Sequence, residues 1–179
     1  MNTFLAACMF TCCMSCQQGK MVKTVNSSDT TLLSRIDKPV SVGAIPAVSL
    51  FTFSENNHAA FDSNSQTWLL FDDPIVTEAP DGVYEIYLTD QPPLVNELTA
   101  TNPAFVNVLD LYSITAPGAK QIIEVNITSA IKKMFLQKQE LRPFYLTLIF
   151  SGNRLPDGSQ SKNAGKMELR GIRMVQTKR

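Results

Sequence analysis

The sequence predicts an all-β fold: a single antiparallel β-sandwich, jelly-roll or cupredoxin-like, with one short helix. Three observations predict this class. The chain has 179 residues, of which 44% are hydrophobic and 18% charged, so one domain can bury a real core. From Pro39 onward, short apolar or alternating runs are separated by turn signals. Only one stretch shows helical spacing.

The expected strands follow one another with short connections. The clearest is 83–88, in which Tyr84, Ile86 and Leu88 share one face and should point into the core. The β-rich run at 67–71 stops at Asp72-Asp73-Pro74. The complete set of predicted strands is 40–42, 48–53, 67–71, 75–76, 83–88, 105–112, 121–125, 145–150 and 167–175.

One helix is predicted after the strand at 121–125. Asn126 or Thr128 can cap it, and apolar residues from Ile127 to Phe135 recur near helical spacing. The helix should end before Pro143, because a residue that precedes proline disfavours the helical conformation.

The N-terminus is typical of an export leader. All four cysteines lie in the first 16 residues, so the body of the chain has no disulfide framework. Residues 3–15 are apolar and uncharged, long enough for a signal h-region and too short to span a bilayer. Ser15 before Cys16 resembles the cleavage box of bacterial lipoproteins, in which the cysteine becomes the acylated first residue. We therefore expect export to the cell envelope, with Cys16 as lipid anchor.

These features divide the chain into a leader at 1–16, a tether at 17–38 and a β-sandwich domain at 39–179. Residues 17–37 are polar and rich in Ser and Thr, as a tether would be. Two other interpretations of the cysteines remain open. With Met9, Met14 and Met21 they could bind Cu(I) through soft sulfur ligands, or they could serve only as small apolar residues.

Composition excludes several classes of function. Sixteen basic and sixteen acidic side chains give no net charge, so nucleic acid is not an expected partner. The single histidine, His58, excludes sites built from several imidazoles. A triad of His58 with Ser54 and Asp62 has no nucleophile-elbow motif beside it, and a surface histidine is the simpler interpretation. We therefore expect no enzyme, no catalytic residue and no cofactor.

Three further patterns each allow two interpretations. Asp72-Asp73 could ligate calcium, but strand termination before Pro74 is favoured and no metal site is assigned. Five aromatic residues could form a sugar platform or pack in the core: Trp68, Tyr84, Tyr87, Tyr112 and Tyr145. Residues 1–119 carry a net charge of −8 and residues 120–179 a net charge of +8. This split could form a basic face, although complementary pairing between distant strands is favoured.

The order of several segments resembles the C-terminal region of the tyrosinase and polyphenol oxidase family. The segments are WLLFDDPIV with PDGVYEIYL at 68–88, FVNVLDLY at 105–112, IIEVNIT at 122–128, YLTLIF at 145–150 and MELRGIRM at 167–174. The resemblance covers about residues 40–175, and its specificity comes from the order of the segments. It implies a β-sandwich that shields the copper site of a separate catalytic domain, and it transfers no catalytic residue.

The function expected from the sequence is therefore a non-enzymatic, exported protein-binding or shielding module. Its partner would be a separately encoded copper oxidase or another envelope protein, reached through loops such as 91–102 and 151–165. The membrane would be contacted only through the lipid anchor. The alternatives are a lipoprotein that binds carbohydrate or another cell-surface ligand, a copper-handling protein that uses the N-terminal Cys/Met cluster, and a hydrolase with an unrecognised site.

Overall fold

The computed structural model describes residues 30–54, 61–109, 111, 121–135, 141–152, 159 and 161–178. Within them, strands dominate and every strand pairing is antiparallel, so the predicted all-β class is confirmed. The elements are β1 (Thr30–Ile36), β2 (Val40–Val42), β3 (Ala47–Phe51), β4 (Gln66–Asp72), β5 (Ile75–Glu78), β6 (Val83–Thr89), the 3₁₀ turn η2 (Val95–Glu97), β7 (Phe105–Leu109), β8 (Ile122–Asn126), α2 (Thr128–Phe135), β9 (Phe144–Gly152), β10 (Lys166–Leu169) and β11 (Gly171–Thr177).

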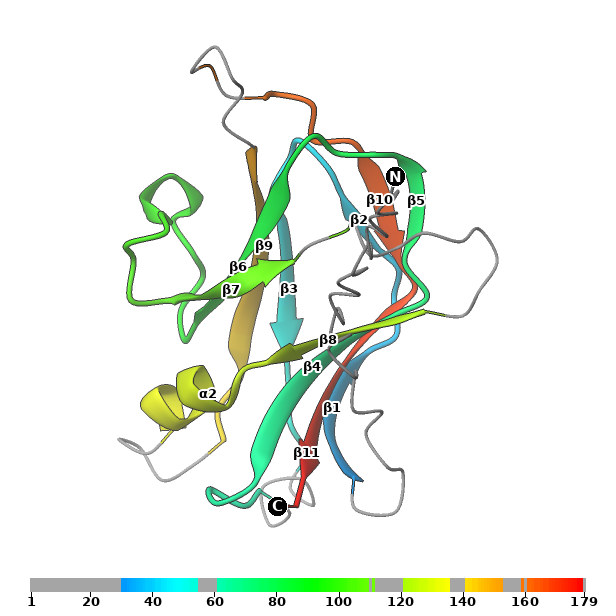
Figure 1. Ribbon diagram of the computed structural model, residues 1–179. Helices are drawn as coiled ribbons and strands as arrows, with labels where there is room; N and C mark the ends of the chain where they lie inside the picture. Colours follow the sequence, from blue (N-terminus) through cyan, green and yellow to red (C-terminus); the bar gives the residue numbers. More distant parts are fainter. Residues whose placement is uncertain are drawn as a thin grey trace, which may run out of the picture.

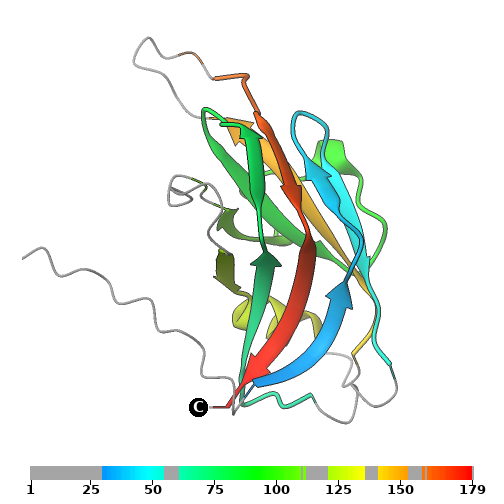
Figure 2. The same ribbon diagram turned by 90° about the vertical axis from the view of Figure 1, so that its right-hand side faces the viewer.

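Two layers of strands face each other (Figure 1). One layer, called here the bent layer, consists of the sheets β1-β11-β4-β8 and β2-β10-β5. These two sheets continue one another, because β1 runs into β2, β4 into β5 and β10 into β11, as Figure 2 shows. The breaks fall at Lys38-Pro39, at Asp73-Pro74 and at Arg170. The other layer, called the opposing layer, has the order β3-β9-β6-β7.

The strand order is that of a jelly roll. If each broken strand is taken as one, the first strand pairs with the last (β1 with β11), then β3 with β9, β4 with β8 and β6 with β7. Such nested antiparallel pairs arise when a long hairpin is rolled into two sheets. Of the two fold types that the sequence left open, the topology therefore selects the jelly roll.

The core lies between the layers and is built by strand alternation. The predicted core face of β6 is confirmed, since Tyr84, Ile86 and Leu88 are buried. Tyr84 also donates a hydrogen bond to the carbonyl oxygen of Ala164. Because burial disfavours the phenolate, the pKa of Tyr84 is raised. The largest other buried side chains are Leu33, Phe51, Leu69, Phe71, Tyr87, Leu109, Ile127, Ile131, Phe144 and Leu146.

The predicted helix is present as α2 and closes one end of the sandwich. Asn126 Oδ1 accepts the N–H of Thr128 at 3.0 Å, so the expected capping residue satisfies the first helical amide. Thr128 Oγ1 accepts the N–H of Thr67 at 2.8 Å, which ties the helix to β4. Ile131 and Phe135 are buried, and the Phe135 ring meets Phe144 with centroids 6.3 Å apart.

The tether expectation is wrong for residues 30–36. They form β1, which pairs with β11 along its length, and Leu33 is fully buried. The domain therefore begins by Thr30 rather than at 39. The polar look of this segment has a structural reason, because β1 is an edge strand with one face toward solvent. The expected leader at 1–16, Cys16, the Cys/Met cluster and residues 17–29 lie outside the described residues.

Two strand boundaries also differ from expectation. The predicted strand 167–175 breaks at Arg170 into β10 and β11. The residues that belong to the core cluster are odd-numbered in β10 (Met167, Leu169) and even-numbered in β11 (Ile172, Met174), so the core-facing alternation slips by one residue at the break. The strand predicted at 105–112 is described as β7 up to Leu109, and Tyr112 lies outside the described residues.

Candidate functional site

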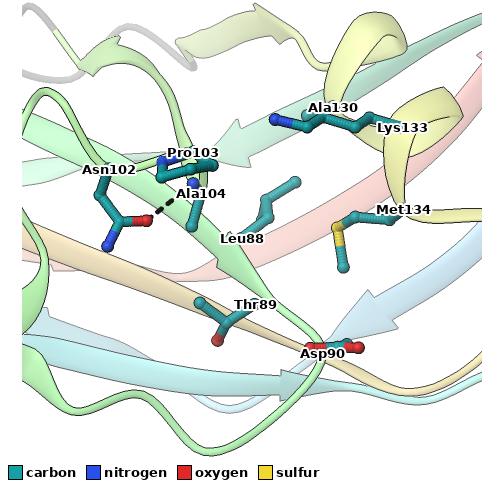
Figure 3. A pocket seen from close by; sticks show the side chains of 9 residues that line it. All are labelled: Leu88, Thr89, Asp90, Asn102, Pro103, Ala104, Ala130, Lys133 and Met134. Carbon is teal, nitrogen blue, oxygen red and sulfur yellow. Dashed lines mark hydrogen bonds between the residues drawn. The ribbon is translucent and has the colours of Figure 1, made fainter.

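A surface groove lies between α2 and the chain that leads into β7 (Figure 3). Three segments form it: the end of β6, the loop before β7, and one face of α2, which lies further along the chain. Its volume is about 340 Å³, near the lower end of ligand-binding clefts. The lining residues are Leu88, Thr89, Asp90, Asn102, Pro103, Ala104, Ala130, Lys133 and Met134.

Asn102 organises the wall of the groove opposite the helix. Its Oδ1 accepts the N–H of Ala104 at 2.9 Å, and its Nδ2 donates to the carbonyl oxygen of Glu97 at 3.1 Å. Its own backbone N–H donates to the carbonyl oxygen of Thr99 at 2.8 Å. One side chain therefore ties η2 to the residues that enter β7. Because these bonds are local, the wall keeps its shape without a bound partner.

The groove has an apolar middle and opposite charges at its ends. In Figure 3, Leu88 and Met134 lie between the Lys133 ammonium on one side and the Asp90 carboxylate on the other. A smaller hollow of about 60 Å³ shares Asp90 and Met134 and adds Arg142. The lining residues include no cysteine and no histidine, and the Thr89 hydroxyl donates to the carbonyl oxygen of Gln91 at 2.8 Å. The groove is therefore amphipathic, with an apolar middle and one charge at each end.

The two loops predicted to reach a partner lie at opposite ends of β6. Residues 91–102 follow Thr89, whereas the residues after Gly152 start beside Val83. Six steps of about 3.3 Å separate these ends by roughly 20 Å. The groove adjoins the first loop, through Asn102. Of the second loop, residues 153–158 and 160 lie outside the described residues.

The described end of the second loop is packed against the turn at 79–82. The backbone N–H of Asp81 donates to the carbonyl oxygen of Asn163 at 2.9 Å, and Ser161 Oγ donates to Asp81 Oδ2 at 3.2 Å. Gly165 has a φ of 64°, a conformation that glycine adopts without strain. This part of the loop therefore has a structural role in the fold.

The candidate aromatic residues do not form one platform. Tyr84 and Tyr87 are fully buried. Trp68 is half-buried on the outer side of the bent layer, because its neighbours Leu69 and Phe71 point into the core. Tyr145 is half-buried on the outer side of the opposing layer, and Tyr112 lies outside the described residues. Core packing explains Tyr84, whereas Tyr87 is buried on the outer face of β6, where its ring lies 5.7 Å from that of Phe105. The two half-buried residues, Trp68 and Tyr145, are on opposite faces of the molecule.

Asp72 and Asp73 stabilise the bend of the bent layer. Asp72 accepts two hydrogen bonds from Arg173, from Nε and from Nη2, each at 2.6 Å. Hydrogen bonding to Asp72 raises the pKa of Arg173. Asp73 adopts a φ of 44° and donates its N–H to the carbonyl oxygen of Gln121 at 2.9 Å. Among the described residues no group of three potential metal-ligating side chains is found. The favoured interpretation, strand termination, agrees with these contacts.

Asp62 forms hydrogen bonds within a turn and with the buried side-chain amide of Gln176. Its carboxylate accepts the Asn64 N–H at 2.9 Å and the Ser65 hydroxyl at 2.7 Å, and these bonds lower the pKa of Asp62. The buried Gln176 side chain accepts the Asp62 N–H and donates to the Asp62 carbonyl oxygen, both at 2.9 Å. His58, the centre of the conceivable triad, lies outside the described residues.

The charge asymmetry of the sequence is matched in space by complementary contacts. Arg173 pairs with Asp72, and Lys166 Nζ lies 3.5 Å from Glu78 Oε2. Lys178 and Lys132 both lower the pKa of Asp62. In each case a base from the C-terminal third meets an acid from the first half. These contacts favour complementary pairing between distant strands over a single basic face.

Two further findings complete the description of the site. Within the described part of the chain, no helix combines the length and the apolar character needed to cross a bilayer. Neither the comparison with protein-family models nor that with curated proteins finds a match for this chain.

Proposed function

We propose that this chain is an exported, non-enzymatic jelly-roll module that binds a partner protein through the groove between α2 and the 102–104 loop. The observation that carries the proposal is the arrangement of the groove: an apolar middle between Lys133 and Asp90, with a wall held in place by Asn102. A protruding segment with an apolar side chain and a flanking charge would fit this arrangement.

The proposed partner is a separately encoded copper oxidase whose entrance the module covers. The resemblance to the C-terminal region of tyrosinases supports this choice, and so does the all-β fold that the resemblance implies. Fold alone does not determine function, so the groove has to be tested directly. Attachment to the cell envelope through Cys16 belongs to the same proposal.

The test uses the purified chain and a purified di-copper oxidase encoded beside it. We expect the chain to bind the oxidase in calorimetry and to slow phenol oxidation. Lys133→Glu should weaken binding about tenfold, because it reverses the charge at one end of the groove. Lys132→Glu is the matched control, since Lys132 is the preceding helical residue and does not line the groove. Unchanged oxidation together with no binding at about 100 µM would refute the proposal.

The anchor has its own test. Mass spectrometry of the protein isolated from membranes should find a chain that begins at a diacylated Cys16. A chain that retains residues 1–15 with free thiols would contradict the lipoprotein proposal and would favour copper binding by the Cys/Met cluster.

A further inference from the structure

The junction of β8 and α2 carries the sequon Asn126-Ile127-Thr128, in which a residue other than proline separates asparagine from threonine. Sequons of this form accept N-linked saccharides in exported proteins. Glu124 stands two positions before the asparagine, so the segment also satisfies the longer sequon, with an acidic residue at that position, that bacterial transferases read. The chain has one other sequon, Asn26-Ser27-Ser28, which lies outside the described residues.

Asn126 is accessible in the folded chain even though it caps the helix. It is exposed and ends β8, an edge strand of the bent layer. The cap uses the side-chain oxygen, because Oδ1 accepts the N–H of Thr128 at 3.0 Å. Within the described part of the chain, Nδ2 of Asn126 has no hydrogen-bond partner. The atom that carries an N-linked saccharide is therefore the one that the fold does not use.

The surroundings of Asn126 suit an attached sugar. Its neighbours Val125 and Ile127 belong to the core cluster, so Asn126 lies on the outer side of the bent layer. Its cross-strand partner on β4 is Trp68, which is half-buried on the same side. A sugar at this position lies beside an indole ring, which offers an apolar surface. It also obstructs the free side of an edge strand against pairing with another chain.

We propose that Asn126 is an N-glycosylation site of the exported chain. The co-substrate is a saccharide linked to a polyprenyl diphosphate. Nδ2 forms a bond to the anomeric carbon, and the bond from that carbon to the diphosphate oxygen breaks. Polyprenyl diphosphate leaves, one amide proton passes to a base of the transferase, and nothing is oxidised or reduced. The product is a secondary amide that keeps Oδ1, so the cap on Thr128 is retained.

This inference rests on the export that the proposed function includes, and it does not depend on the groove or on the oxidase. It also fixes an order of events. A transferase that selects threonine or serine in the sequon has to contact the hydroxyl. In the folded chain, Thr128 Oγ1 accepts the Thr67 N–H at 2.8 Å and donates to the Thr67 carbonyl oxygen at 3.3 Å. Transfer therefore precedes the docking of this segment on β4.

The experiment is mass spectrometry of a tryptic digest of the full chain, isolated from native membranes. Trypsin cleaves after Lys120 and after Lys132, so one peptide, Gln121–Lys132, contains Asn126 and no other sequon. We expect this peptide to carry the mass of a saccharide, located at Asn126 by fragmentation. An unmodified peptide overturns the proposal, and so does a saccharide found only at Asn26.

Two variants separate the modification from folding. Asn126→Asp keeps an oxygen that caps α2 but has no amide nitrogen. It should lose the saccharide and keep the cooperative thermal transition in circular dichroism. Thr128→Ser keeps the hydroxyl and should retain the saccharide. A saccharide that persists on this peptide in Asn126→Asp, or that is absent from Thr128→Ser, contradicts the assignment.

The same digest tests export separately, because it also gives the first residue of the chain. A chain that begins at Cys16 with an unmodified Asn126 refutes glycosylation and leaves export standing. A modified Asn126 on a chain that retains residues 1–15 supports glycosylation and contradicts the lipoprotein proposal.

The order of events is tested in vitro with a purified transferase and a saccharide on polyprenyl diphosphate. The synthetic peptide Gln121–Lys132 should accept the saccharide, whereas the folded, unmodified full chain should not, because its Thr128 hydroxyl is bonded to Thr67. Equal transfer to both would contradict this order.

Discussion

Single side chains in this protein hold together segments that lie far apart in the sequence. Arg173 and Asp72 are 101 positions apart and form two parallel hydrogen bonds where the bent layer changes direction. Gln176 and Asp62 are 114 positions apart, and the buried Gln176 amide satisfies both backbone groups of Asp62. Such charge-assisted and amide contacts specify geometry as well as adding stability.

The pair of Arg173 and Asp72 gives a prediction at this scale. Asp72→Asn should lower the free energy of unfolding by about 1–3 kcal/mol, because it removes a charged acceptor and leaves the partly buried Arg173 without its counter-charge. Urea denaturation measures this difference. Glu78→Gln serves as control, since its pair with Lys166 is exposed and should be worth no more than about 1 kcal/mol. Equal losses in both variants would show that the bidentate geometry adds nothing.

At the scale of elements, α2 both closes one end of the core and forms one wall of the groove. Its inner side buries Ile131 and Phe135 at the end of the sandwich, and its outer side supplies Lys133 and Met134 to the groove. The Phe135 ring meets Phe53, Phe61 and Phe144 with centroid distances of 6.4, 6.2 and 6.3 Å. Aromatic edge contacts of this kind add to the gain from burial.

Phe135→Ala should therefore cost about 3–5 kcal/mol, because it opens a cavity among aromatic rings that cannot collapse without moving the helix. Differential scanning calorimetry records the loss as a lower Tm. Phe135→Leu should cost much less, since it keeps most of the volume. If the alanine variant melted like the wild type, the helix would contribute nothing to the closure of the core.

The elements differ in how well their sequences predict them. In β6, apolar residues alternate with polar or outward ones, and this pattern correctly gave the core face. The sequence of β1 is as polar as that of a tether, because an edge strand needs only one buried face. The break at Arg170 is visible in the sequence, because the apolar core positions change from odd-numbered (Met167, Leu169) to even-numbered (Ile172, Met174). The groove could not be predicted, since it requires the ends of β6 and α2 to meet, and only the jelly-roll order brings them together.

On the scale of the whole molecule, the domain boundary is the feature most open to test. A chain from Cys16 to the C-terminus contains β1 and should unfold cooperatively. A chain that begins at Pro39 lacks β1, which exposes one edge of β11 and leaves the core without Leu33. We expect it to aggregate or to lose its cooperative thermal transition, as measured by circular dichroism. A cooperative transition at the same temperature in both chains would show that the domain begins at residue 39, as the sequence predicts.

The position of β11 between β1 and β4 also determines when the protein can fold. Because β11 must be inserted between two strands that are synthesised before it, the bent layer cannot be completed until β11 has left the ribosome. If the protein is exported as proposed, a chain whose bent layer is still incomplete is the form that a narrow translocation channel accepts.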